Sequence, residues 1–182
     1  MLTREQALEL LRAENTSESL LKHAFASEAV MTALANRLQE NATLWGLTGL
    51  LHDLDYPKLA DCPERHGLEA AEKLQAFLPT DALDAIKAHN GELNGCPPKT
   101  KFDYALRCGE SVTGLITAAA LMRPTGYEGM SVKSIKKKMK DKAFAAGASR
   151  ENIKQCEQIG LALDEFLELA IKAISEIEPA IK

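Results

Sequence analysis

The chain has 182 residues, the length of a single compact domain, and its 46% apolar and 26% charged residues exclude disordered and fibrous proteins. Its 22 basic and 26 acidic residues give a net charge of −4, which argues against nucleic acid or an anionic membrane as the main partner. The longest largely apolar run, residues 115–122, is too short to cross a bilayer. The N-terminal residues lack the features of a signal peptide, and the four cysteines form no CxxC pair. We therefore expect a cytoplasmic protein with reduced thiols, and its oligomeric state stays open.

The composition predicts an all-α fold, because the chain holds 27 Ala and 26 Leu but only 3 Val. Thr3 followed by Gln6 is the pattern of a capping box at the start of a first helix. We expect one domain over residues 1–182, with a core of about 17–125 and C-terminal helices within 131–178 that pack on it. The expected helices cover about residues 3–13, 17–38, 43–54, 66–78, 80–89, 102–122, 131–146 and 149–177, with a loop over 90–100.

His52 and Asp53 stand side by side in the sequence LLHDLDYP, within a segment rich in leucine. The segment is typical of a core helix, where a charged carboxylate is costly unless it is paired or bound to a metal. Neighbouring side chains on a helix diverge by about a hundred degrees, so the two residues could flank one ion while other helices supply further ligands. Alternatively, His52 satisfies a core carbonyl and Asp53 pairs with a lysine or arginine. The doublet alone favours neither interpretation.

Three more histidines and a later acid extend this pattern. His23 precedes the doublet, and His66, His89 and an acid at position 110 follow it. With the flanks LLHDLDYPK, ERHGLEAAEKL, AIKAHN and GESVTGLITAAALMRP, this ordered set resembles the HD superfamily of metal-dependent phosphohydrolases. The resemblance covers about residues 17–170. It implies an all-α HD-domain helical bundle with a central metal site, held by residues from several helices.

The resemblance also implies which residues bind the metal. It assigns the primary set to His23, His52, Asp53 and Glu110, and a second ion of binuclear members to His66 and His89, with Asp53 between the two ions. In mononuclear members the second pair of histidines is absent as ligands or holds substrate phosphate. Imidazole and carboxylate without thiolate suit Fe, Mn, Zn, Co or Ni. We therefore expect one or two divalent transition-metal ions.

Glu110 departs from the family pattern, which normally has aspartate at this position. The extra methylene shifts the carboxylate by more than a bond length, whereas metal–oxygen distances stay near about 2.0–2.2 Å. Glu110 either ligates from a shifted backbone or binds through water. Asp103 is the rival, but it lies seven residues earlier, about 10 Å along the same helix. We favour Glu110.

Charged residues around these positions have two interpretations each. Lys58 and Arg65 bracket a loop next to the expected site, where they contact substrate phosphate during catalysis or merely lie on the surface. Asp55 either supports a metal ligand or ends a helix, and Glu69 lies three residues after His66 on the same expected helix face, from which it could orient that ring.

The basic run over residues 132–142 also has two interpretations. Its lysines form a solvated face, or else Lys133, Lys137 and Lys140 line the mouth of the cleft and attract anionic substrate.

The hypothesis that follows is a metal-dependent phosphohydrolase, in which a metal-activated water attacks a nucleotide or another small phosphorylated metabolite. His52 and Asp53 are its central catalytic residues. Two alternatives remain open. A minority of HD-fold proteins use the same ligands as di-iron oxygenases, and the change at Glu110 is compatible with a catalytically weak nucleotide-binding regulator.

Overall fold

The computed structural model describes residues 2–14, 16–59 and 61–181, the last four of these through their backbone only; residues 1, 15, 60 and 182 of the expected unit lie outside the described residues. Within the described ranges the chain is helical and contains no strand, which confirms the all-α prediction. The helices and 3-10 turns, in chain order, are α1 (Arg4–Ala13), α2 (Glu18–Leu38), α3 (Ala42–Leu51), η1 (Tyr56–Lys58), η2 (Pro63–Arg65), α4 (Leu68–Leu74), α5 (Thr80–His89), α6 (Gly91–Asn94), α7 (Lys101–Leu121), α8 (Val132–Lys140), α9 (Arg150–Lys154), η3 (Gln155–Ile159) and α10 (Leu163–Ile181).

Several helices begin where their local sequence indicates. The Thr3 hydroxyl accepts a hydrogen bond from the backbone N–H of Gln6, and the Thr3 backbone N–H donates to the Gln6 side-chain oxygen, so the predicted capping box is present. Ser17 caps α2 in the same way through the backbone N–H of Leu20. Such caps satisfy N–H groups that have no partner within the helix, and they therefore fix its first turn.

Other helices are shorter than their sequence pattern predicts. Gly67 has a φ of +84° at the start of the helix expected over 66–78, so that α4 begins only at Leu68. Gly160 has a φ of +82° and separates α9 and η3 from α10, where one helix was expected from 149 onward. The basic helix stops at Lys140 instead of continuing to 146. In the first two cases a left-handed glycine interrupts a continuous apolar pattern.

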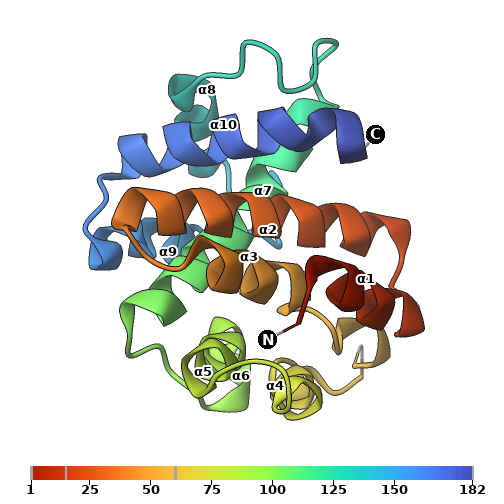
Figure 1. Ribbon diagram of the computed structural model, residues 1–182. Helices are drawn as coiled ribbons and strands as arrows, with labels where there is room; N and C mark the ends of the chain where they lie inside the picture. The colour runs from red at the N-terminus through yellow and green to blue at the C-terminus, as the bar shows by residue number, and fades with distance from the viewer. Residues whose placement is uncertain (1, 15, 60, 182) are drawn as a thin grey trace.

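The central helix is α2, which packs against α3, α7 and α10 (Figure 1). The pair α4 and α5 lies below α3 in the view of Figure 1, and α5 also packs on α7. On the opposite part of the molecule, α8 and α10 pack together, and α7 contacts α8, α9 and η3. One hydrophobic cluster runs through these contacts, from Leu2 to Ile174. That residues 1–182 form a single domain stays a prediction.

In the described part of the chain, no helix has both the length and the apolar character that a membrane span requires.

Two glycines allow α2 and α3 to approach closely. A Cβ atom built on Gly49 would lie 2.7 Å from the Ser27 carbonyl oxygen and 2.8 Å from Met31 Cγ. One built on Gly46 would lie 2.5 Å from the Thr32 hydroxyl. Because the end of α3 carries the His52–Asp53 doublet and α2 carries His23, this close packing determines how near those side chains come to each other.

Replacing Gly49 by alanine should therefore destabilise the fold. The added methyl group meets backbone atoms that cannot move aside, so we expect the free energy of unfolding in urea to fall by about 1–3 kcal/mol. Gly114→Ala is the matched control, because Gly114 is an exposed position within α7 and its added Cβ would only touch Ala148 at 3.7 Å. The control should be neutral or more stable by up to about 1 kcal/mol. Equal stability of the two variants would contradict the close-packing argument.

Candidate metal centre

The Asp53 carboxylate lies where four imidazole rings meet. Its Oδ1 lies 3.2 Å from His52 Nε2, 3.3 Å from His66 Nε2 and 3.5 Å from His89 Nε2. Its Oδ2 lies 3.5 Å from His23 Nε2. The five side chains form two groups of three that share Asp53, and within each group the possible ligand atoms lie within 4.8 Å of one another. One group contains His23 and His52, and the other contains His66 and His89.

Separate elements bring these side chains together. His23 lies in the second turn of α2, and His52 caps the C-terminal end of α3. Asp53 follows in the turn after α3, so the doublet stands just past the helix in which it was expected. His66 follows the η2 turn, and His89 is the last residue of α5. Helix ends and turns thus supply most of the site.

Each ring uses its Nδ1 for a hydrogen bond and points its Nε2 toward Asp53. The N–H groups of His52 and His89 donate to the carbonyls of Gly49 and Ile86, each three residues back along the chain. These carbonyls lie in the last turn of their helices, where they have no intrahelical partner. A proton held on Nδ1 leaves the Nε2 lone pair available, which is the arrangement that metal-binding histidines require.

The other two rings are oriented by side chains. The Asp55 carboxylate accepts from His66 Nδ1 at 2.8 Å and from the backbone N–H groups of Gly67 and Ala70 at 2.8 and 2.9 Å. Asp55 is fully buried, and it takes the supporting role that the sequence analysis left open. The Thr113 hydroxyl donates its proton to the Glu110 carbonyl at 2.7 Å. The Thr113 hydroxyl oxygen therefore accepts a hydrogen bond from His23 Nδ1 at 2.9 Å.

The charges favour a cation beside Asp53. Burial lowers the pKa of His52 to about 3, which keeps this ring neutral. Burial also acts to lower the pKa of His66, but hydrogen bonds and charge interactions with Asp53 and Asp55 outweigh it and raise this pKa to about 9. Burial acts to raise the pKa of Asp53, but the surrounding imidazoles, His52 first, hold it well below its usual range. The Asp53 carboxylate is therefore charged.

The donor set fits a transition-metal ion. The Nε2 atoms of His66 and His89 lie 2.9 Å apart, and those of His23 and His52 lie 3.2 Å apart. Because the Nδ1 atoms already donate elsewhere, two facing Nε2 lone pairs need a proton or a metal ion between them. Imidazole nitrogens with one carboxylate and no thiolate suit borderline divalent cations.

Glu110 lies next to this cluster but belongs to neither group of three. Burial raises the pKa of its carboxyl group, and the charges of His23 and His89 partly offset this effect. The Ser111 hydroxyl donates a short hydrogen bond to it. Asp103, the rival candidate, caps the start of α7: its Oδ2 accepts from the backbone N–H groups of Lys99 and Thr100. Asp103 is thus engaged away from the histidines.

The structure pairs the two basic residues expected near the substrate with acids. Lys58 Nζ lies 2.5 Å from Glu14, and Arg65 Nε lies 2.7 Å from Glu69. Both basic side chains are about half exposed. The suggestion that Glu69 orients His66 is wrong, because Asp55 holds that ring. It assumed that residues 66–69 form one helix face, and Gly67 interrupts that helix.

Sequence reasoning missed Thr113 and the role of Gly67. Thr113 lies 90 residues from His23, so no local pattern connects the two. A Cβ on Gly67 would lie 2.8 Å from the Ile86 carbonyl and 3.3 Å from the His89 ring, so only glycine allows His66 to approach His89 this closely. The positive φ and the close approach together explain the His66–Gly67 dipeptide.

Thr113→Val should disturb His23 without changing the shape of the core. Valine removes the acceptor for His23 Nδ1, so we expect a mixture of ring tautomers in the ¹⁵N spectrum of His23 in the metal-free chain. Affinity for a transition metal should fall about 10–100-fold in a chelator competition. Thr113→Ser, which keeps the hydroxyl, should restore both properties. A valine variant with the native tautomer and affinity would show that Thr113 only fills space.

Comparison with known proteins agrees with this geometry. A model of the HD domain family matches residues 20–125, more than half of the chain, and this span includes Glu110 and the five side chains of the cluster. No curated protein and no solved structure matches the chain. HD-domain proteins hold divalent metals with histidine and aspartate, and the residues that would do so here converge on one carboxylate. The chain therefore belongs to the HD domain family.

Proposed function

We propose that the chain is a metal-dependent phosphohydrolase that acts on a nucleotide or another small phosphate ester. The observation that carries the proposal is the Asp53 carboxylate, which is shared by two groups of imidazoles whose Nε2 atoms all point inward. Membership of the HD family supports the reaction class. A carboxylate shared between two ligand groups is typical of two-metal sites that act on phosphate esters.

In this proposal His23, His52 and Asp53 hold one ion, and Asp53, His66 and His89 hold a second. Glu110 completes the set, either directly or through water, because its half-buried carboxyl group interacts with the charges of His23 and His89. The ions are divalent Fe, Mn, Zn, Co or Ni. When bound, such ions stabilise charge on phosphoryl oxygens and lower the pKa of water at the site.

The protein's own contribution is to fix the geometry. Asp55 and Thr113 hold two of the rings so that their Nε2 atoms stay directed at Asp53. Lys58 and Arg65 are proposed to contact the substrate phosphate, which would require each to leave its present acidic partner. Since the surrounding hydrogen bonds already exist in the folded chain, little reorganisation is needed when substrate arrives.

The first test is Asp53→Asn, which keeps the shape of the side chain but removes its charge. We expect transition metal measured per chain, after purification without chelator, to fall by at least about tenfold, because an amide is a poor ligand for a borderline cation. Hydrolysis of a panel of nucleotides and p-nitrophenyl phosphate should be lost with it. Asp84→Asn is the control, because Asp84 is exposed and forms an ion pair with Lys87 on the surface of α5.

Both variants must keep the helical circular dichroism spectrum of the wild type, so that a loss of metal is not caused by unfolding. Full metal occupancy in Asp53→Asn would show that the carboxylate is not a ligand. Bound iron with oxygen uptake and no phosphatase activity would contradict the proposed reaction and point to an oxygenase.

The second test counts the ions. Replacing both His66 and His89 by alanine should remove one metal per chain and leave the other, because His23, His52 and Asp53 form an independent group. The reciprocal variant, with alanine at His23 and His52, should leave the second ion. A wild-type chain that binds one ion, unchanged in the His66/His89 variant, would mean that this pair binds no metal.

A further inference from the structure

A cavity lined by basic side chains lies far along the chain from the histidines. A cavity of about 530 Å³ opens between α8, the loop 141–149, α9 and the start of α10. Its lining includes five basic side chains, Lys136, Lys140, Lys142, Arg150 and Lys154, and one acidic one, Glu151. We call it the lysine pocket. The elements that carry the four histidines and Asp53 contribute nothing to its lining, so it is separate from the candidate metal centre.

Most of the positive charge in the lysine pocket is not neutralised. Lys136 pairs with Asp164 at 2.6 Å. Lys140, Lys142 and Lys154 form no ion pair with any carboxylate in the ranges that the structure describes. Unpaired ammonium groups that converge on a concave surface attract a multivalent anion.

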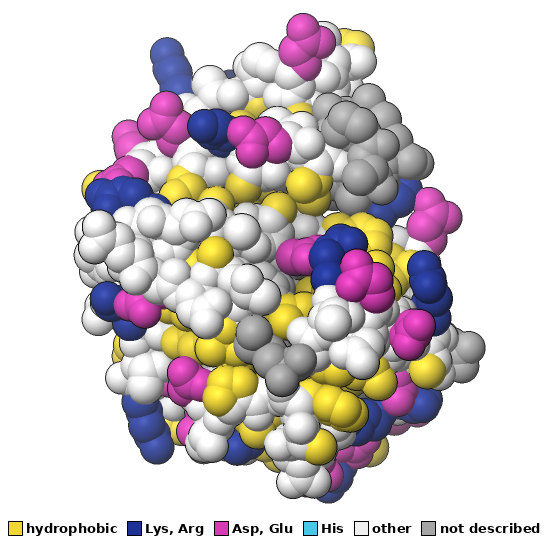
Figure 2. Space-filling model, in the orientation of Figure 1, with side chains coloured by type: hydrophobic (Ala, Val, Ile, Leu, Met, Phe, Trp, Pro, Cys, Tyr) yellow, Lys and Arg dark blue, Asp and Glu magenta, His cyan; other side chains and the backbone are white. Residues whose placement is uncertain are grey.

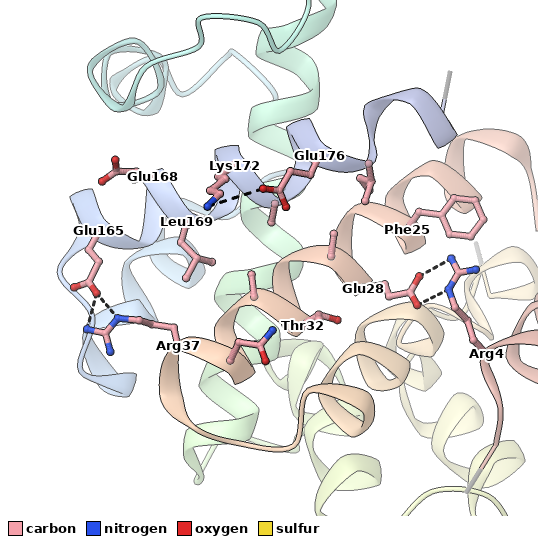
Figure 3. A pocket seen from close by; sticks show the side chains of 15 residues that line it. Arg4, Phe25, Glu28, Thr32, Arg37, Glu165, Glu168, Leu169, Lys172 and Glu176 are labelled. Atoms are coloured by element: carbon pink, nitrogen blue, oxygen red, sulfur yellow. Dashed lines mark hydrogen bonds and ion pairs between the residues drawn. The ribbon is translucent and has the colours of Figure 1, made fainter.

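Another, larger cavity provides a contrast. It measures about 910 Å³ and lies between α1, α2 and α10 (Figure 3). There, Arg4 pairs with Glu28 and Arg37 pairs with Glu165, each at 2.7 Å. Basic and acidic side chains also lie next to each other across the face of the molecule in Figure 2. The charges of that cavity therefore cancel locally, whereas those of the lysine pocket do not.

One wall of the lysine pocket is fixed by Arg150. Its guanidinium donates to the backbone carbonyls of Asp141, Phe144, Ala145 and Ala148. Ala145 has a φ of +45°, which a residue other than glycine adopts only when its surroundings enforce it. Arg150 thus holds the loop in a curve through backbone carbonyls, and its charge stays in the pocket wall. The pocket is a built feature, not a chance gap between mobile lysines.

Positive charge is also concentrated in this segment of the sequence. Residues 132–154 contain eight basic and two acidic residues, whereas the rest of the chain contains 14 basic and 24 acidic residues. An anion is therefore repelled by most of the molecule and attracted to this segment. Met139, Ala148 and Leu163 add an apolar part to the pocket lining. Lys140, considered above for the mouth of the catalytic cleft, lines this pocket instead.

We propose that the lysine pocket binds a small anion with a triphosphate group, contacted by Lys140, Lys142 and Lys154. The source of that group is a nucleoside triphosphate or an inorganic polyphosphate. A nucleoside would also use the apolar part of the lining. The site is independent of the proposed hydrolytic reaction, because it shares no residue with the metal centre.

The test is calorimetric titration of the full chain with inorganic triphosphate and, separately, with ATP, both in EDTA so that no metal bridges the phosphates. The variant Lys140→Gln/Lys142→Gln removes two charges from the pocket. Lys133→Gln/Lys137→Gln removes two charges from α8, the helix that carries Lys140, at positions outside the lining. We expect affinity to fall at least about tenfold in the pocket variant and less than about twofold in the control, because charge-assisted contacts act at short range.

The outcomes separate the possibilities. Tighter binding of ATP than of inorganic triphosphate identifies a nucleotide as the ligand, and equal binding identifies the phosphate chain alone. An equal loss in both variants, or no binding of either probe, overturns the proposal. The proposal would also be overturned if a single-stranded RNA oligonucleotide bound more tightly than either probe and lost affinity in both lysine variants. Repeating the titration with Asp53→Asn should leave affinity unchanged, whereas a loss there would place the anion at the metal centre.

Discussion

The charge of Asp53 is the constraint on which the rest of the site depends. A carboxylate whose side chain is only 17% exposed is costly unless positive or hydrogen-bonding groups surround it. Four imidazoles meet this requirement, and a hydrogen bond at Nδ1 fixes the orientation of each ring. Two of those bonds go to free carbonyls at helix ends, so the termination of α3 and of α5 is itself part of the site. The close packing of α2 on α3 at Gly49 completes the arrangement by placing His23 beside His52.

The part of the molecule outside the family match also supports the site. Arg107, almost fully buried in α7, donates to the carbonyls of Ala88 and His89 at the end of α5. The same guanidinium is held by Asn152 and Gln155, which lie beyond residue 125. A buried cation of this kind needs all its partners, because each one removed leaves a charged donor unsatisfied. The segment after residue 125 is therefore tied to the backbone that positions His89.

The sequence predicts those features that depend on neighbours along the chain. The capping box at Thr3, the start of α2 near Ser17 and the extent of α5 and α7 are local signals, and the structure has them. Contacts made across the fold could not be predicted in this way. Thr113 reaches His23 only because α7 packs on α2. Glu69 was considered as a residue that could orient His66 because helical spacing was assumed, but Gly67 precedes the helix and Asp55 holds the ring instead.

The distribution of charge differs between the two sites proposed to bind phosphate. Around the candidate metal centre, Lys58 and Arg65 are already paired with Glu14 and Glu69, so these side chains offer little net positive charge to an approaching anion. In the proposed reaction, most of the attraction at that site would come from the metal ions, with Lys58 and Arg65 contributing only after they leave their acidic partners. The lysine pocket supplies its own charge through ammonium groups without carboxylate partners among the described residues. If both proposals hold, phosphate binding at the metal centre depends on bound metal, whereas binding at the lysine pocket depends on ionic strength, because salt screens exposed lysines far more than a buried centre.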